Sequence, residues 1–197
     1  YATYDANGNM TSGAGAALTY DTQNRLQTAS PTSGGVEKYG YAPNNKRVYR
    51  VSPGGSETFT LYGLGGEKLG EYNMEYTQLR QTRGYVNFAG RPVAEDNRLY
   101  GTITVIYPDR LGTNRGSGAR FRPYGDEITS TTQDREKFAT YNRDGFTGLD
   151  YADQRYFAST YGRFDTPDGY KASATAQDPG SWNLYAYVQG DPINAND

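Results

Sequence analysis

The sequence predicts an all-β fold, built from stacked antiparallel β-hairpins and closed by a turn-rich C-terminal cap. Aromatic residues make up 14% of the 197 residues, with 20 Tyr and 7 Phe, and aromatic side chains favour pleated strands. The chain also contains 25 Gly and 9 Pro, which are typical of tight turns. Tyrosine recurs at a nearly constant interval through the first half of the chain, which indicates a repeated structural unit.

The repeat starts with two Tyr-Asp pairs, Tyr4-Asp5 and Tyr20-Asp21, each followed by turn-forming residues. Later units lose the aspartate but keep the interval. Subtraction of residue numbers gives intervals of 21, 21, 23 and 22 residues between the tyrosines at positions 20, 41, 62, 85 and 107. An interval of about 21 residues accommodates two short strands and two turns. We therefore expect one antiparallel hairpin per interval, with each hairpin packed on the next.

Alternation of residue character locates the strands within these units. Strands are expected over 35–42, 46–51, 56–62 and 102–107, and turns over 43–45, 52–55 and 63–66. Period-2 alternation places one face of each strand inward and the other outward.

The composition of the chain changes after Pro108, and the repeat is no longer visible in the sequence there. Residues 126–135 have the composition of a loop, and a short helical turn is expected around 135–138. The last repeat of an array needs a cap, because it otherwise exposes its apolar face. Three regions result: hairpin repeats over 1–108, connecting strands and a loop over 109–144, and the cap over 145–197.

Composition excludes several classes of function. Histidine and cysteine are both absent, which removes Ser-His-Asp and Cys-His catalysis and the commonest metal ligands. We therefore expect no metal and no cofactor. The net charge of −2 and the isoelectric point near 5.3 provide no basic field for nucleic acid. No apolar stretch approaches the about 20 residues of a membrane span. The composition favours a structural role over an enzymatic one.

Two local patterns bear on ligand binding. Asp5-x-Asn7-x-Asn9 has the oxygen spacing that opens a calcium loop, but Met10 stands where Gly is needed and no distal Glu completes it. Exposed tyrosines and Trp182 can stack on sugar rings, which keeps binding of surface glycans as an alternative. Tyrosines at a fixed interval are more typical of ladder residues that pack one hairpin on the next.

An ordered set of motifs gives the chain a family resemblance. The two Tyr-Asp units are followed by motifs at residues 107–115, 122–125, 146–157, 161–164, 182–188 and 191–194. Together they resemble the RHS-repeat-associated core of YD-repeat proteins, and the resemblance covers nearly the whole chain. It implies strands that spiral into a hollow β shell, as in the toxin-complex C component, bacterial polymorphic toxins and teneurins, with the core segment closing one end.

The resemblance also implies a candidate catalytic site. In many relatives the core cuts its own chain with a pair of aspartates and releases a C-terminal toxin. Carried over to this sequence, the motif residues are Arg163, Asp168 and Asp197, while Gly169 stands where the family has Pro and the sequence ends at Asp197. Two close carboxylates can share one proton and act as acid and base without histidine. The alternative is that these residues only hold turns of the cap.

We therefore expect a structural shell or scaffold segment of an exported bacterial RHS-repeat protein, secreted or displayed at the cell surface. One alternative is a subunit of a self-assembling extracellular fibre, since open strand edges pair. The other is the aspartyl self-cleaving core. The expected partners are the remainder of the shell or other copies of the chain, and an encapsulated toxin and surface glycans are further candidates. Because the sequence opens at Tyr1 without a signal-like segment, we expect it to be a piece of a longer protein.

Overall fold

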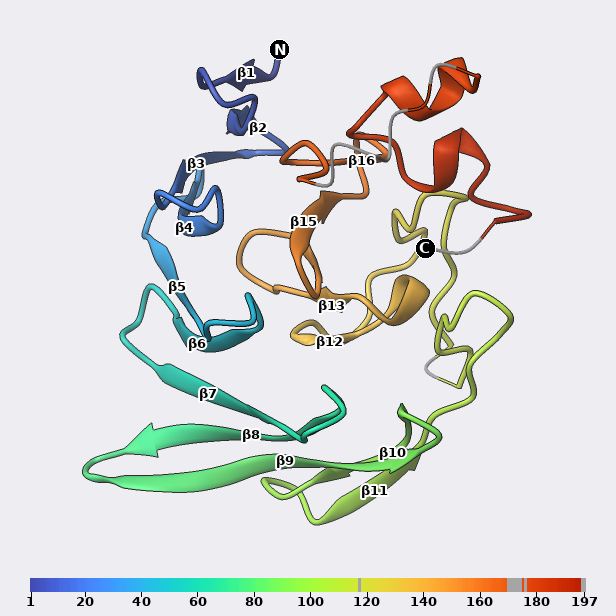
Figure 1. Ribbon diagram of the computed structural model, residues 1–197. Coiled ribbons are helices and arrows are strands. Elements are labelled where there is room, and N and C mark those ends of the chain that lie inside the picture. The colour runs from blue at the N-terminus through green and yellow to red at the C-terminus, as the bar shows by residue number, and fades with distance from the viewer. Residues whose placement is uncertain (117, 170–174, 176, 196–197) are drawn as a thin grey trace.

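The chain folds into two antiparallel sheets. The structure, a computed structural model, describes residues 1–116, 118–169, 175 and 177–195. One sheet has eleven strands and the other five, and both follow the chain order. The larger sheet, here called the wall, curves as a strip around the smaller one, here called the inner sheet (Figure 1). The predicted all-β class is confirmed.

Most elements are short strands. The wall consists of β1 (Thr3–Tyr4), β2 (Met10–Gly13), β3 (Ala16–Tyr20), β4 (Leu26–Pro31), β5 (Glu37–Tyr41), β6 (Arg47–Val51), β7 (Glu57–Tyr62), β8 (Lys68–Glu75), β9 (Gln78–Phe88), β10 (Arg91–Asn97) and β11 (Thr102–Val105). The inner sheet consists of β12 (Arg135–Glu136), β13 (Asn142–Arg143), β14 (Asp150–Ala152), β15 (Arg155–Ala158) and β16 (Arg163–Phe164). The described 3-10 helices are η1 (Phe138–Thr140), η3 (Pro179–Trp182) and η4 (Val188–Gly190). Among the described residues, no helix has the length and apolar character needed to cross a membrane.

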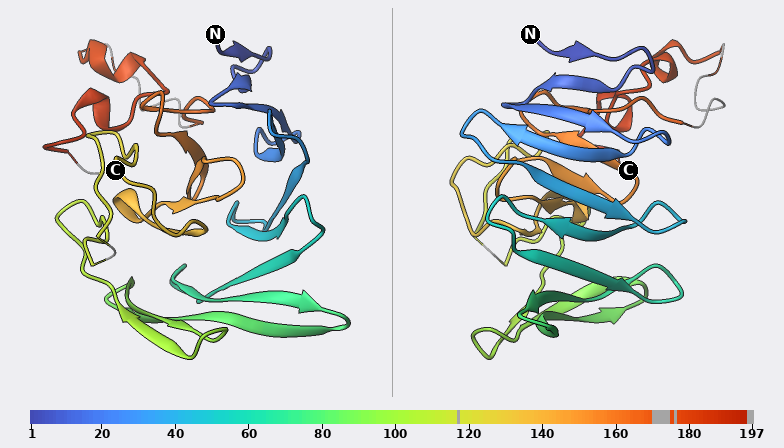
Figure 2. Two further views of the ribbon diagram at one scale, coloured as in Figure 1. Left: turned by 180° about the vertical axis from the view of Figure 1, so that it is seen from behind. Right: turned by 90° about the vertical axis from the view of Figure 1, so that its left-hand side faces the viewer.

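The predicted strands of the repeat region are confirmed. Strands β5, β6, β7 and β11 lie within the four expected ranges, and the three expected turns follow β5, β6 and β7. Each strand of the wall pairs with the next along the chain, so the hairpins stack in order from β1 to β11. Figure 2 shows this stack from the side, with successive strands as rungs of one strip.

One turn geometry recurs along the chain. The N–H of the first residue donates to the C=O of the fifth, and the N–H of the fourth donates to the C=O of the first. The fourth residue has a positive φ, for example 85° at Gly8 and 60° at Asn24, which Gly and Asn adopt readily. Turns of this kind include residues 5–9, 21–25, 42–46, 63–67 and 109–113. The last of these lies beyond Pro108, where the sequence repeat is no longer visible.

The aspartate of the Tyr-Asp pair stabilises this turn. Asp5 Oδ1 accepts hydrogen bonds from the backbone N–H groups of Asn7 and Asn9 at 2.9 and 2.8 Å. Asp21 Oδ1 accepts the two equivalent bonds at 2.9 and 3.0 Å, and so does Asp109 at 2.9 and 3.0 Å. The carboxylate thus supplies acceptors to donors that the tight turn leaves without strand partners.

The periodic tyrosines link one hairpin to the one before it. The hydroxyls donate to backbone carbonyls of the preceding unit: Tyr20 to Met10 at 2.9 Å, Tyr41 to Leu26 at 2.7 Å and Tyr62 to Arg47 at 3.1 Å. A cation from the end of a turn or the start of the next strand lies over each of three successive rings: Arg25 over Tyr41 at 5.1 Å, Lys46 over Tyr62 at 4.9 Å and Lys68 over Tyr85 at 4.7 Å. These contacts bear out the ladder interpretation of the periodic tyrosines.

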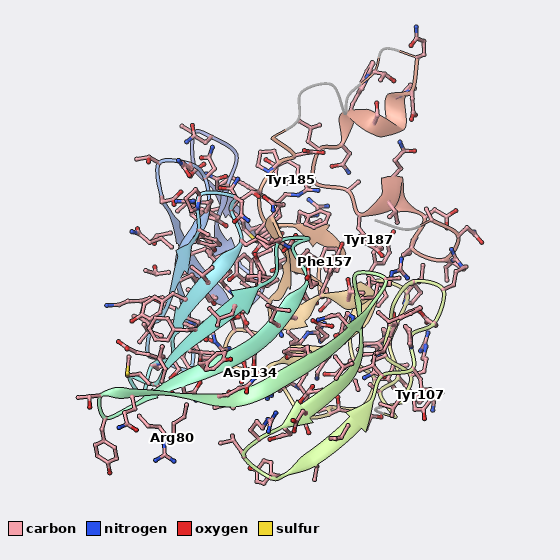
Figure 3. The ribbon with its side chains drawn as sticks, turned by 60° about the horizontal axis from the view of Figure 1, so that its bottom comes forward. Arg80, Tyr107, Asp134, Phe157, Tyr185 and Tyr187 are labelled. Carbon is pink, nitrogen blue, oxygen red and sulfur yellow. The ribbon has the colours of Figure 1, made fainter. Side chains whose placement is uncertain are left out.

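The hydrophobic core lies between the wall and the inner sheet. In its first part, wall residues such as Leu18 and Leu26 pack with Tyr156 of β15 and with Leu149, which directly precedes β14. Its second part is largely aromatic and consists of Phe138, Ala139, Tyr141, Phe157, Phe164 and Tyr187. Phe157 and Tyr187 lie inside the curve of the wall (Figure 3), with ring centroids 5.3 Å apart. The inner sheet and the residues packed with it in the core therefore fill the concave side of the strip.

One expectation for the C-terminal third needs correction, and one of its features was not expected. The helical turn expected around 135–138 is wrong in its position, because Arg135 and Glu136 form strand β12 and the 3-10 turn covers residues 138–140. The inner sheet itself was not expected from the sequence. Its strands have two to four residues each, too few to display an alternating pattern.

Candidate functional site

Buried charges join the wall to the inner sheet. Arg47, the first residue of β6, follows a tight turn that directs its side chain toward the inner sheet. Its Nη1 donates to Asp144 Oδ2 at 2.5 Å and to the Tyr156 hydroxyl at 2.7 Å, and its backbone N–H donates to the Tyr151 hydroxyl at 2.7 Å. Asp144 is fully buried and Arg47 is 7% exposed. A buried ion pair of this kind holds the wall and the inner sheet in one relative position, because removing either partner leaves the other charge buried and unpaired.

A second group of charges extends this junction along the wall. Arg50 lies 3.3 Å from Glu37 and 3.5 Å from Asp144, and it also pairs with Asp134. Burial and the negative charge of Asp144 raise the pKa of Glu37 to about 7. The Tyr39 hydroxyl donates to Glu37 Oε2 at 2.9 Å. Inside the junction, burial therefore holds the pKa of the Glu37 carboxyl above its ordinary value, although Arg50 opposes the shift.

A third buried pair belongs to the inner sheet alone. Arg143 of β13 donates from Nε and Nη2 to the two carboxylate oxygens of Asp150 at 2.8 and 2.6 Å. Its Nη2 also donates to Gly125 O at 2.9 Å and to Ser159 Oγ at 3.1 Å. Burial raises the pKa of Asp150 to about 6, although the arginine opposes this.

Asp165 differs from these acids because its carboxyl has no hydrogen-bond partner. It is fully buried, and both oxygens lack a donor among the described residues. Its backbone joins two elements: its C=O accepts from the Met10 N–H at 2.8 Å, and its N–H donates to Tyr156 O at 2.9 Å. Burial, and then the charge of Asp150, raise its pKa to about 8. A pKa raised in this way favours the neutral form of the Asp165 carboxyl at pH 7.

Two of the three predicted catalytic residues lie in the described C-terminal segment. Arg163 pairs with Ala158 in the inner sheet and bridges to Ala186. The Asp168 N–H donates to Leu184 O at 2.9 Å. Asp197 lies outside the described residues, so its distance from Asp168 is untested. The catalytic role of Arg163, Asp168 and Asp197 stays a prediction.

Sequence reasoning passed over Asp165, which stands between the two motif residues Arg163 and Asp168. The only available signal was an acid next to Phe164 in a segment where aromatic residues are buried. Its burial depends on the docking of Met10, which is distant in the chain and not readable from the motif.

Asp168 lines a polar cleft of about 300 Å³ between the turns of the wall and the C-terminal segment. Most of the other lining residues carry carboxamide or guanidinium groups. The lining residues are Asn9, Gln23, Asn24, Arg25, Asn45, Gln154, Arg155, Thr166, Pro167, Asp168 and Gly169. The cleft is called the carboxamide cleft below.

The Asp5-x-Asn7-x-Asn9 pattern forms a turn whose polar groups bond to one another. Asn9 Nδ2 donates to Asp5 Oδ2 and to Asn24 Oδ1, both at 2.9 Å, and Asn7 Nδ2 donates to Asn24 Oδ1 at 3.0 Å. Within the described ranges, no group of three or more His, Cys, Asp or Glu side chains is arranged to hold a metal ion.

The fold matches solved structures of toxin complexes. A Photorhabdus luminescens Tc holotoxin pore with a TccC3 variant gives a TM-score of 0.67 and 19% identity, over 98% of this chain and 10% of that chain. A TcdB2-TccC3 structure gives 0.70 and 20% identity, over 98% and 11% of the two chains. A TcdB2-TccC3-TEV structure gives 0.71 and 20% identity, over 98% and 10%. This confirms the predicted resemblance at the level of the fold.

The chain spans about a tenth of the length of the solved chains that it matches. No protein-family model matches the sequence, and a search of curated proteins also finds no match.

Proposed function

We propose that this chain is a segment of a closed β shell, in which the C-terminal third docks on the concave side of the wall. The observation that carries the proposal is the eleven-stranded strip that curves around its own C-terminal core (Figure 1). A flat sheet that exposed this inner face to water would leave Leu18, Leu26 and Tyr39 uncovered. The likeness to TccC3 chains over 98% of the sequence supports the same role.

The polar junction suits a scaffold rather than a mobile lid. Arg47, Asp144 and Tyr156 are buried together, and their mutual bonds require one relative position of the wall and the inner sheet. The cost of separating them is high, because each would then need a new partner or water. The junction therefore holds the C-terminal third at a fixed place against the wall.

The remainder of a longer shell is the proposed partner, and secretion or surface display the proposed location. Both proposals are supported by the likeness of this fold to chains of toxin complexes, and by the small share of those chains that this chain spans. An encapsulated C-terminal toxin is a proposed cargo.

The experiment that tests the closed shell is protease treatment of the native protein followed by mass spectrometry. Fragments from the concave side survive if the shell is closed; cleavage throughout β15 and β16 at the same rate as in the exposed turns contradicts it.

Self-cleavage is a second candidate function, favoured by the position of Asp168 in the carboxamide cleft. Its test is the accumulation of a cut product from the native protein. Replacement of Asp168 by Asn is expected to leave the chain whole, whereas the control Asp153→Asn, which alters an exposed ion pair with Lys46, is expected to be cut normally. Equal cutting in both variants removes Asp168 from the mechanism.

A further inference from the structure

The carboxamide cleft has an unusual composition for a surface hollow. Five of its lining side chains end in a carboxamide: Asn9, Gln23, Asn24, Asn45 and Gln154. Four of them belong to three successive turns of the wall, and Gln154 belongs to the turn between β14 and β15. The turn geometry that the repeat imposes therefore places amide groups in a row along one edge of the strip.

Several of these amides retain unused bonding capacity. Asn9 is 1% exposed, and its Oδ1 is buried without a hydrogen-bond partner. Asn24 and Asn45 use their Oδ1 atoms within the row, as acceptors from Asn9 and from Arg25. Their Nδ2 groups, and the whole Gln23 amide, make no hydrogen bond with any described residue. The cleft is thus lined by amides with unused donors at Asn24 and Asn45, and by the unused Gln23 amide.

The charges of the cleft are largely engaged elsewhere. Arg25 forms an ion pair with Asp21 at 2.7 Å. Arg155 lies over the Phe164 ring at 3.7 Å and donates to Leu184 O at 3.2 Å. The carboxyl of Asp168 is the one acid in the lining. A strongly charged ligand therefore finds little net attraction.

We propose that the carboxamide cleft binds an extended polypeptide segment through its backbone. A carboxamide carries the same donor and acceptor pair as a peptide group, so each free amide can bond to a backbone N–H or C=O. Successive turns of the strip lie two strands apart, about 10 Å, and three residues of an extended chain span about the same distance.

A sugar chain fits the lining less well than a peptide. Among the described lining residues no side chain is aromatic, and Pro167 is the only large apolar surface. Without a ring to stack on, a sugar loses the contact that aromatic platforms supply. The proposal does not depend on the shell role or on self-cleavage, because it requires binding only.

The test is nuclear magnetic resonance of the 197-residue chain, observing the Asn and Gln side-chain amides during titration. The probe is a short capped peptide of alternating Ala and Thr, which is uncharged and extended. The comparison probe is the same peptide with methylated backbone nitrogens, and a third probe is a cello-oligosaccharide. We expect the first peptide to shift the amides of Asn9, Asn24 and Gln154, with a dissociation constant in the millimolar range, and the methylated peptide to bind at least about fivefold more weakly.

Variants locate the contact, and the readout separates it from catalysis. Gln154→Glu replaces a donor by an acceptor at the rim and is expected to weaken peptide binding about fivefold. The matched control Gln27→Glu makes the same change on an exposed residue of β4 outside the cleft and is expected to leave binding unchanged. The readout is binding of an added peptide and not cutting of the chain, so this proposal and the self-cleavage candidate fail separately.

Three outcomes overturn the proposal. One is the absence of shifts at the cleft amides at the highest soluble peptide concentration. Another is equal binding of the methylated and unmethylated peptides, which excludes backbone recognition. The third is a shift of the cleft amides by the oligosaccharide and not by the peptide, which assigns the cleft to sugars.

Discussion

Replacement of Asp165 by Asn is expected to stabilise the protein at neutral pH. The carboxyl group is buried without a donor, and its pKa rises from the ordinary value of 3.8 to about 8 in the folded chain. Between these values the folded state must carry a proton that the unfolded state has released. Folding stability therefore falls as the pH rises from about 4 to about 8, and it is constant below and above that window.

The size of the effect follows from the pKa shift. Each pKa unit corresponds to about 1.4 kcal/mol, and about three units separate the unfolded pKa from pH 7. The penalty at pH 7 is thus about 4 kcal/mol, to order of magnitude. Asn has nearly the same shape as Asp and does not ionise. Asp165→Asn is therefore expected to raise the free energy of unfolding by up to about 4 kcal/mol at pH 7 and to leave it unchanged at pH 3.

The assay is urea unfolding of both proteins at a series of pH values from 3 to 9. The native protein is expected to lose stability across the window, and the variant to lose much less. Glu75→Gln, on the exposed β8–β9 hairpin, is the control and is expected to change stability by less than about 1 kcal/mol. If Asp165→Asn destabilises the protein at pH 7 and leaves the pH dependence intact, Asp165 is ionised and paired, and the reasoning is refuted.

Other substitutions test the junction and the repeat by urea unfolding at pH 7. Arg47→Met leaves the buried Asp144 carboxylate without its main partner and is expected to cost about 3–5 kcal/mol; a loss below about 1 kcal/mol means that the pair is not buried in solution. Tyr41→Phe removes the hydroxyl bond to Leu26 and is expected to cost about 1 kcal/mol, whereas no loss contradicts the ladder bond. Asp21→Ala removes two backbone bonds of its turn and is expected to cost about 1–2 kcal/mol, and an unchanged midpoint argues against that turn.

The repeat region was predictable because one physical cause recurs in it. Asp5 and Asp21 stabilise equivalent turns, and Tyr20 and Tyr41 bond to equivalent carbonyls, so the sequence displays the interval directly. The motif also persists structurally where it fades in the sequence. Asp109 makes the same turn bonds as Asp5, although Pro108 separates it from the tyrosine. The domain boundaries at 108 and 144 stay predictions.

The site was harder to predict because its residues meet only through packing. Arg47 and Asp144 are 97 positions apart, and no local pattern marks either as buried. The strands of the inner sheet are too short to alternate, and the burial of Asp165 depends on Met10 at the other end of the chain. The family motif instead identified Arg163 and Asp168, and their catalytic role stays a prediction.

Electron microscopy of the native protein that contains this chain tests the central claim most directly. The account predicts hollow particles in which strands β1 to β11 continue one closed wall and the inner sheet lies on the luminal side. A regular filament, or a particle with the inner sheet on its outer surface, would contradict the shell and favour assembly through strand edges.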